Sequence, residues 1–128
     1  MEISLSLTGD LENPIIEFGG KISRAKNFYQ EGPLMAFLIS IPHCIATMAD
    51  SIAKKEGITL SSCKIIARYV LDEKEMFLGN YVFKKIIIEI YGKGCSEEEL
   101  KELIKKVKRE CPIYLSFREK IEIEGKLA

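Results

Sequence analysis

The sequence lacks a net charge. Its 128 residues contain 19 lysines and arginines against 19 aspartates and glutamates, so the formal charge at pH 7 is zero. A protein whose main partner is nucleic acid normally carries a basic excess, and this balance argues against that class. The absence of a large charge also weakens repulsion between copies, which favours an oligomer. At this length we expect a single domain over residues 1–128, with enough buried surface for one core.

The sequence also lacks a targeting signal and a long apolar run. Its start contains neither the basic segment nor the apolar segment of a secretory signal. The longest apolar stretch lies between Pro33 and Pro42 and spans about ten residues, whereas a helix that crosses a bilayer needs about twenty. We therefore expect a soluble, cytoplasmic protein that contacts no membrane.

A CxxC pair is absent as well. Structural zinc sites usually take their ligands from closely spaced cysteine and histidine pairs, so no metal is expected and a zinc module is a distant alternative. Four cysteines in a cytoplasmic chain also do not predict a disulfide scaffold. The four are Cys44, Cys63, Cys95 and Cys111. We expect Cys63 to be a core residue of a strand and Cys95 to be an inert loop thiol.

Short apolar segments near the start of the chain have the pattern of strands. Residues 3–8 alternate apolar and polar side chains, which is typical of a half-buried strand. A second apolar run covers residues 15–18 and ends at a glycine pair. A third strand is expected over residues 21–27.

A pair of longer segments predicts an antiparallel hairpin. Alternating side chains cover residues 60–72 and 81–91. The connection between them, residues 72–80, reads as a polar loop.

A long helix is predicted from Pro33 to about Glu56. Apolar side chains recur at steps of three and four, as they do on the buried face of a helix. Gly57 supplies a C-terminal stop. Pro42 lies inside this helix and lacks the N–H that an α-helix uses there, so we expect a kink or a restart at that point.

A second helix is predicted after Ser96, which forms a capping box with the glutamate three residues later. Pro112 ends this helix just after Cys111 and opens a short helical piece to about Arg118. Residues 121–124 alternate again and predict a last strand. This order of elements predicts an α+β domain in which an antiparallel sheet packs on a long central helix and a second helix.

Two cysteines stand on inward-facing helical positions. Cys44 lies in the middle of the first apolar stripe and Cys111 ends the second, so the two could meet across a helix contact or be ordinary core residues. A new helical turn at Pro112 would favour a thiolate at Cys111, and the break at Pro42 opens the helix surface near Cys44. A thiolate attacks peroxides, and a second thiol nearby resolves the sulfenic acid as a disulfide.

Three segments of the chain carry a family resemblance. Gly32 to Cys44 reads GPLMAFLISIPHC, Gly57 to Leu60 reads GITL, and Glu110 to Tyr114 reads ECPIY. In this order they resemble the cysteine-bearing helix, the helix exit and the C-P helix end of the OsmC-like family, which includes the organic hydroperoxide resistance proteins. The resemblance covers about residues 30–127.

The resemblance implies an OsmC-like fold and an intertwined homodimer with two sites at its interface. It implies that Cys44 is the peroxidatic thiol and Cys111 the resolving thiol in the reduction of organic hydroperoxides or hydrogen peroxide. No bound cofactor is implied, and an external dithiol such as a lipoylated protein would recycle the disulfide. We expect Phe37, Ile41 and Met48 to line an apolar substrate pocket.

The chain departs from the family pattern at one point. The glutamate that follows the proline in the family, and that holds an arginine against the thiolate, is replaced here by Leu34 and Met35. We nominate Arg24 and His43 as side chains that could stabilise the Cys44 thiolate in its place. Without a cation, the pKa of Cys44 stays near its usual value or rises with burial. A second hypothesis is therefore a non-catalytic dimer of the same fold that binds a small apolar ligand or senses redox state.

Overall fold

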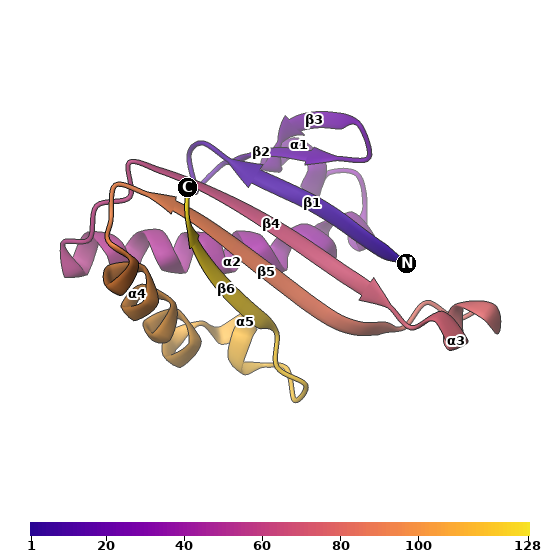
Figure 1. Cartoon of the computed structure of the whole chain (residues 1–128). Helices are drawn as coiled ribbons and strands as arrows, with labels where there is room; N and C mark the ends of the chain where they lie inside the picture. The colour runs from indigo at the N-terminus through magenta and orange to yellow at the C-terminus, as the bar shows by residue number, and fades with distance from the viewer.

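A computed structural model describes all residues, 1–128, as a six-stranded sheet covered on one face by helices (Figure 1). The strands are β1 (Glu2–Thr8), β2 (Ile15–Phe18), β3 (Lys21–Arg24), β4 (Ser62–Leu71), β5 (Phe83–Lys93) and β6 (Glu122–Leu127). The helices are α1 (Ala25–Tyr29), α2 (Pro33–Glu56), α3 (Glu73–Phe77), α4 (Glu97–Glu110) and α5 (Pro112–Leu115). The predicted α+β class is confirmed.

The sheet has the strand order β3-β2-β1-β4-β5-β6. Neighbouring strands are antiparallel except β5 and β6, which are parallel because α4 and α5 lie between them in the chain. The predicted hairpin is confirmed as the long antiparallel pair β4 and β5. Apolar side chains of the sheet's inner face, α2 and α4 form one buried cluster, so both helices lie on the same face.

Helix α2 has the predicted bounds. It begins at Pro33, ends at Glu56 and is followed by Gly57 in the left-handed conformation, with φ of 72°. Of the two outcomes expected at Pro42, the restart is wrong, because the helix continues through that residue, and the kink stays a prediction. Pro42 cannot donate to the carbonyl of Leu38 one turn earlier. The buried Tyr69 hydroxyl of β4 donates to that carbonyl instead, so the missing bond does not end the helix.

Helix α2 is also long and apolar enough to cross a membrane, judged by length and composition alone. Nearly half of its most apolar stretch is buried against the rest of the chain. A core helix of a soluble protein has the same properties.

Helix α4 begins with the predicted capping box. The Ser96 hydroxyl accepts from the Glu99 N–H at 3.1 Å, and the Glu99 carboxylate accepts from the Ser96 N–H at 3.0 Å. The helix packs closely on β6 at Gly125, where a Cβ would lie 2.2 Å from Cδ1 of Ile104. Any larger residue at this crossing would force the Ile104 side chain to shift, so Gly125 lets α4 lie close to β6.

Two sequence predictions missed short helices. Residues 25–27, expected to extend the third strand, belong to α1, whose Ala25 and Phe28 are buried. The expected polar loop 72–80 contains α3, which begins because the Asp72 carboxylate accepts from the N–H groups of Lys74 and Glu75. The short helix after Pro112 ends at Leu115, earlier than expected.

Candidate functional site

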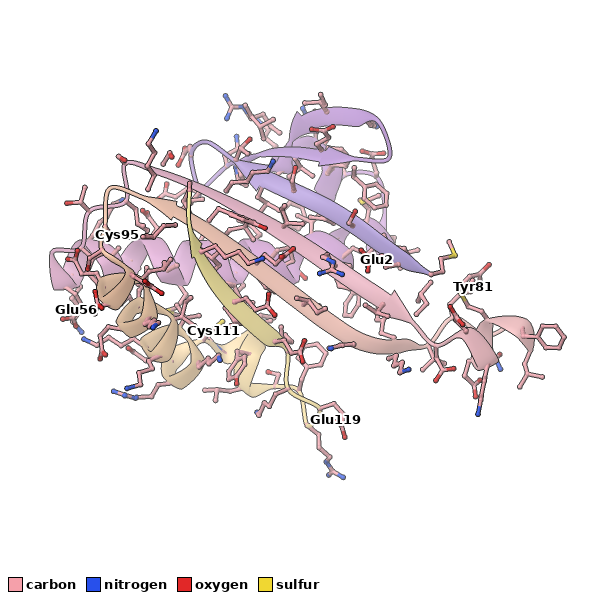
Figure 2. All side chains as sticks on the ribbon, viewed as in Figure 1. Glu2, Glu56, Tyr81, Cys95, Cys111 and Glu119 are labelled. Atoms are coloured by element: carbon pink, nitrogen blue, oxygen red, sulfur yellow. The ribbon has the colours of Figure 1, made fainter.

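The structure brings the two nominated cysteines together. Cys44 lies in the middle of α2, and Cys111 is the residue between α4 and α5. The two thiols are close enough for Cys111 to shift the pKa of Cys44, and they are not joined in a disulfide. Cys111 is completely buried, whereas Cys44 is partly exposed. In Figure 2, Cys111 is labelled where α4 meets α5, and Cys95 lies at the opposite end of α4.

Backbone hydrogen bonds hold Cys111 at the junction of the two helices. Its N–H donates to the Val107 carbonyl at 2.8 Å, and its carbonyl accepts from the Leu115 N–H at 3.0 Å. Its backbone is extended, as expected for a residue before proline. Cys111 therefore occupies the predicted N-cap position of α5, but its side chain makes no capping bond. The backbone N–H of Ile113 in α5 instead acts on Cys44, whose pKa it lowers.

The surroundings of Cys44 favour the neutral thiol. Burial raises its pKa most, and the neighbouring Cys111 raises it further. The Ile113 N–H lowers the pKa and partly offsets these effects. No cationic side chain is among the groups that shift the pKa of Cys44. A thiolate at this position therefore needs a base to form near neutral pH.

The two nominated cations have other partners within the chain. The exposed Arg24 donates through Nη1 to the Asn13 carbonyl at 3.1 Å. The His43 ring is bonded on both sides, with Nδ1 2.7 Å from the Tyr29 hydroxyl and Nε2 2.9 Å from the Glu12 carbonyl oxygen.

Tyr29 is a residue of this site that the sequence interpretation missed. It ends α1, and its ring lies on that of His43 with a centroid distance of 5.7 Å. Burial raises the pKa of Tyr29, and a charge on Cys44 raises it further. The phenol therefore lies within electrostatic range of the thiol. The sequence interpretation assigned residues 21–27 to a strand and so missed α1, the helix that places Tyr29 against His43 of α2.

The nominated pocket residues differ in burial. Ile41 is in the core, Met48 packs partly buried against it, and Phe37 is 43% exposed and stacks on Phe83 at 6.2 Å. A groove of about 750 Å³ lies elsewhere, between α4 and β6, and has no cysteine in its lining. The substrate pocket stays a prediction.

The other two cysteines form a second pair. Cys63 is buried in β4, as predicted, and pairs in register with Gly92 of β5. The partly exposed Cys95 lies over the same glycine, since a Cβ at Gly92 would be 3.6 Å from its sulfur. Burial raises the pKa of Cys63 to about 11, with smaller contributions from Asp50 and Cys95.

A family model described as OsmC-like protein matches residues 31–126. The chain belongs to the OsmC-like family. The match includes both Cys44 and Cys111 and confirms the resemblance predicted from the sequence. No curated protein sequence matches this chain.

Solved structures of OsmC-like proteins share the fold. An OsmC-like protein from Mycoplasma pneumoniae aligns with a TM-score of 0.60 and 17% identity over 100% of this chain and 96% of that one. An organic hydroperoxide resistance protein from Elizabethkingia anophelis, with thiocyanate bound, gives 0.58 and 16% over 96% and 93%. The organic hydroperoxide resistance protein OhrB of Bacillus subtilis gives 0.58 and 16%, with 96% of each chain covered. At these identities the likeness establishes the fold, which confirms the OsmC-like architecture.

Proposed function

We propose that the protein is a thiol peroxidase that reduces organic hydroperoxides or hydrogen peroxide. The Cys44 sulfur attacks one peroxide oxygen, the O–O bond breaks, and the other oxygen leaves as an alcohol or water after taking up a proton. Cys44 becomes a sulfenic acid. The Cys111 sulfur then attacks the Cys44 sulfur, releasing water and forming a disulfide.

The proximity of the two thiols, one partly exposed on α2 and one buried between α4 and α5, is the observation that carries this proposal. A resolving thiol must reach the sulfenic acid before a second peroxide oxidises it further, and a neighbouring thiol meets this need. The partial exposure of Cys44 gives a peroxide access to it, while the burial of Cys111 protects the resolving thiol from direct oxidation.

An organic substrate is supported by the apolar side chains around α2. Phe37 and Met48 stay partly exposed on the helix that carries Cys44, and with Ile41 they form the proposed pocket wall. Such a wall favours an alkyl or aryl hydroperoxide over hydrogen peroxide. Two of the structural relatives are named organic hydroperoxide resistance proteins, which agrees with this substrate class.

The proposal includes a homodimer in the cytoplasm and an external dithiol reductant, such as a lipoylated protein. Large apolar side chains are exposed on α2, on α5 and on the hairpin tip around α3, which projects from the body of the molecule (Figure 1). They include Leu34, Phe37, Phe77, Leu78, Tyr81 and Leu115. A second copy that covered them would remove apolar surface from water. The reductant has to attack an exposed sulfur, which points to the Cys44 side of the disulfide.

The test is a brief exposure of the fully reduced protein to one equivalent of cumene hydroperoxide, followed by intact mass measurement and peptide mapping. We expect a loss of two hydrogens that maps to a Cys44–Cys111 disulfide. Cys44→Ser should abolish it, and Cys95→Ser, which changes another partly exposed cysteine, should leave it intact. Slow oxidation spread over several cysteines, with no disulfide, would contradict the proposal.

A non-catalytic protein of the same fold is the second candidate. The observation that favours it is the raised pKa of Cys44 with no cation to offset the burial. In that case Cys44 and Cys111 would be packing or redox-sensing residues beside a site for a small apolar ligand. This candidate would be supported if the protein formed no disulfide with peroxide but did bind a small apolar ligand.

A further inference from the structure

Strand β6 forms a free edge of the sheet. It stands last in the strand order, with β5 on one side and no strand on the other. Just after β6, the Ala128 N–H donates to the Gly92 carbonyl of β5 at 2.8 Å. In a parallel ladder every second residue turns its N–H and C=O toward the neighbouring strand. Because Ala128 faces β5, the backbone groups of Ile123, Gly125 and Leu127 point outward from the sheet.

A groove of about 750 Å³ lies along this edge, between β6 and α4. Figure 1 shows β6 at the border of the sheet with α4 beside it. The groove is lined by residues 123–127 of β6 and by the apolar side chains of Leu100 and Ile104 from α4. Gly125 has no side chain and lies against both of them. An extended segment in this groove reaches unpaired backbone groups and an apolar floor together.

The helix side of the groove is basic. Lys101, Lys105 and Lys108 follow one another at steps of four and three, so they form one row along α4. Lys101 pairs with Glu97, 3.7 Å away, whereas Lys105 and Lys108 have no carboxylate within ion-pair distance. The whole lining has four lysines against two glutamates, Glu97 and Glu124, so its charge is positive.

We propose that the edge of β6 is a docking site for an extended acidic segment of another protein, which binds as a seventh strand of the sheet. Main-chain hydrogen bonds to Ile123, Gly125 and Leu127 supply the pairing. Acidic side chains of the segment meet Lys105 and Lys108. This inference does not depend on the peroxidase function, because no cysteine lines the groove.

A second copy of this chain fits the edge less well than an acidic segment. Two β6 strands that paired antiparallel across a two-fold axis would place both α4 helices on the same face of the joined sheet. The two lysine rows would then lie opposite each other, and like charges across an interface weaken binding. The charge of the groove therefore favours an acidic occupant over this chain itself.

Fluorescence anisotropy with a defined probe tests the docking site. The probe is a short fluorescein-labelled peptide in which glutamate and valine alternate, and the control peptide has lysine in place of glutamate. We expect saturable binding of the acidic peptide and none of the basic one, and the binding should weaken as the salt concentration rises. Equal binding of the two peptides, or no binding of the acidic peptide, would overturn the proposal.

Reversal of the two unpaired charges locates the binding. We expect the double variant Lys105→Glu with Lys108→Glu to bind the acidic peptide at least about tenfold more weakly, because like charges then face each other. Lys64→Glu with Lys93→Glu is the matched control, since it changes two exposed lysines of β4 and β5 outside the groove. It should bind as the unchanged protein does. Equal losses in the two variants would overturn the site, and circular dichroism of each identifies loss of fold.

Hydrogen exchange followed by NMR tests whether the peptide binds as a strand. In the free protein, the outward amides of Ile123, Gly125 and Leu127 should exchange faster than those of Glu124 and Lys126, which face β5. The acidic peptide should slow the three outward amides, and a peptide with a central proline should bind more weakly. Protection elsewhere in the chain, or equal binding of the proline peptide, would overturn strand addition. Outward amides that are protected in the free protein and lose protection on dilution would show that a second copy occupies the edge, which would also overturn the proposal.

Discussion

Two pairs of cysteines lie close together in this chain, and their surroundings differ. Cys44 and Cys111 lie near each other where three helices meet, and the Ile113 N–H and the hydrogen-bonded Tyr29–His43 pair are close to Cys44. Cys63 and Cys95 lie over Gly92 at the end of the β4–β5 pair. Burial acts on all three of the cysteines whose pKa is shifted, Cys44, Cys63 and Cys95, and it is the largest cause for each.

The comparison shows that proximity alone does not make a redox site. In the first pair, the partly exposed Cys44 has a fully buried thiol neighbour and a backbone N–H from another helix, that of Ile113, which lowers its pKa. In the second pair, burial raises the pKa of the partly exposed Cys95 most and the charge of Glu99 raises it further, while its own backbone N–H lowers it. We therefore expect peroxide chemistry at the first pair and none at the second.

The largest expected effect comes from Cys111→Ser. Without its resolving thiol, Cys44 should stop at the sulfenic acid after one equivalent of peroxide, so disulfide formation is lost completely. Mass spectrometry should show the gain of one oxygen and a dimedone adduct on Cys44. Cys63→Ser is the matched control because it replaces the buried cysteine of the other pair. This variant should still form the Cys44–Cys111 disulfide. If Cys111→Ser instead formed a disulfide between Cys44 and Cys95, the two pairs would not be chemically separate and the comparison would be wrong.

The second pair should affect stability at high pH. The pKa of Cys63 is raised to about 11 in the folded protein from a reference value of 9.0. The unfolded chain then loses this proton first, so stability is fully present below about pH 9 and falls as the pH rises toward 11. The contribution is on the order of 3 kcal/mol. Urea unfolding between pH 9 and 11 should show that the free energy of unfolding declines. The decline should be smaller in Cys63→Ala than in the control variant Cys95→Ala.

The next largest effect concerns the backbone hydrogen bond that Pro42 cannot make, one turn before Cys44 in α2. Tyr69→Phe leaves the Leu38 carbonyl buried and unpaired, which should lower the free energy of unfolding by about 2 kcal/mol. Pro42→Ala restores the helical donor for that carbonyl, so Tyr69→Phe should cost less in this background. Urea unfolding of the two single variants and the double variant measures the coupling. An equal cost in both backgrounds would show that the hydroxyl does not compensate for the proline.

The long elements could be predicted from the sequence because each carries its own local signals. Pro33 and Gly57 mark the ends of α2, and Ser96 with Glu99 marks the start of α4. The apolar stripes of the two long helices include Cys44 and Cys111, which predicted that both lie on inward-facing sides. Their proximity to each other could not be predicted, because it depends on how α4 packs on β6 at Gly125 and on the direction of the chain after Pro112.

The tyrosine–histidine pair beside Cys44 could not be predicted for a related reason. Helix α1 has five residues and no capping side chain, so its sequence carries almost no helical signal. It forms because Ala25 and Phe28 are buried by tertiary packing. The sequence interpretation therefore nominated His43, with Arg24, as a cation without its Tyr29 partner, whereas the structure engages both nitrogens of the His43 ring.

The smallest effect concerns the end of α4 that is far from the first pair. Ser96→Ala removes the hydroxyl that caps the Glu99 N–H next to Cys95, and should cost about 1 kcal/mol of stability. Cys111 is held at the other end of α4 by its bonds to Val107 and Leu115, which the variant leaves in place. We therefore expect urea unfolding at lower denaturant, faster alkylation of Cys95, and an unchanged rate of Cys44–Cys111 disulfide formation. A slower disulfide step would mean that the two pairs are coupled through α4, so that the helix transmits fraying at its start to the junction that positions Cys111.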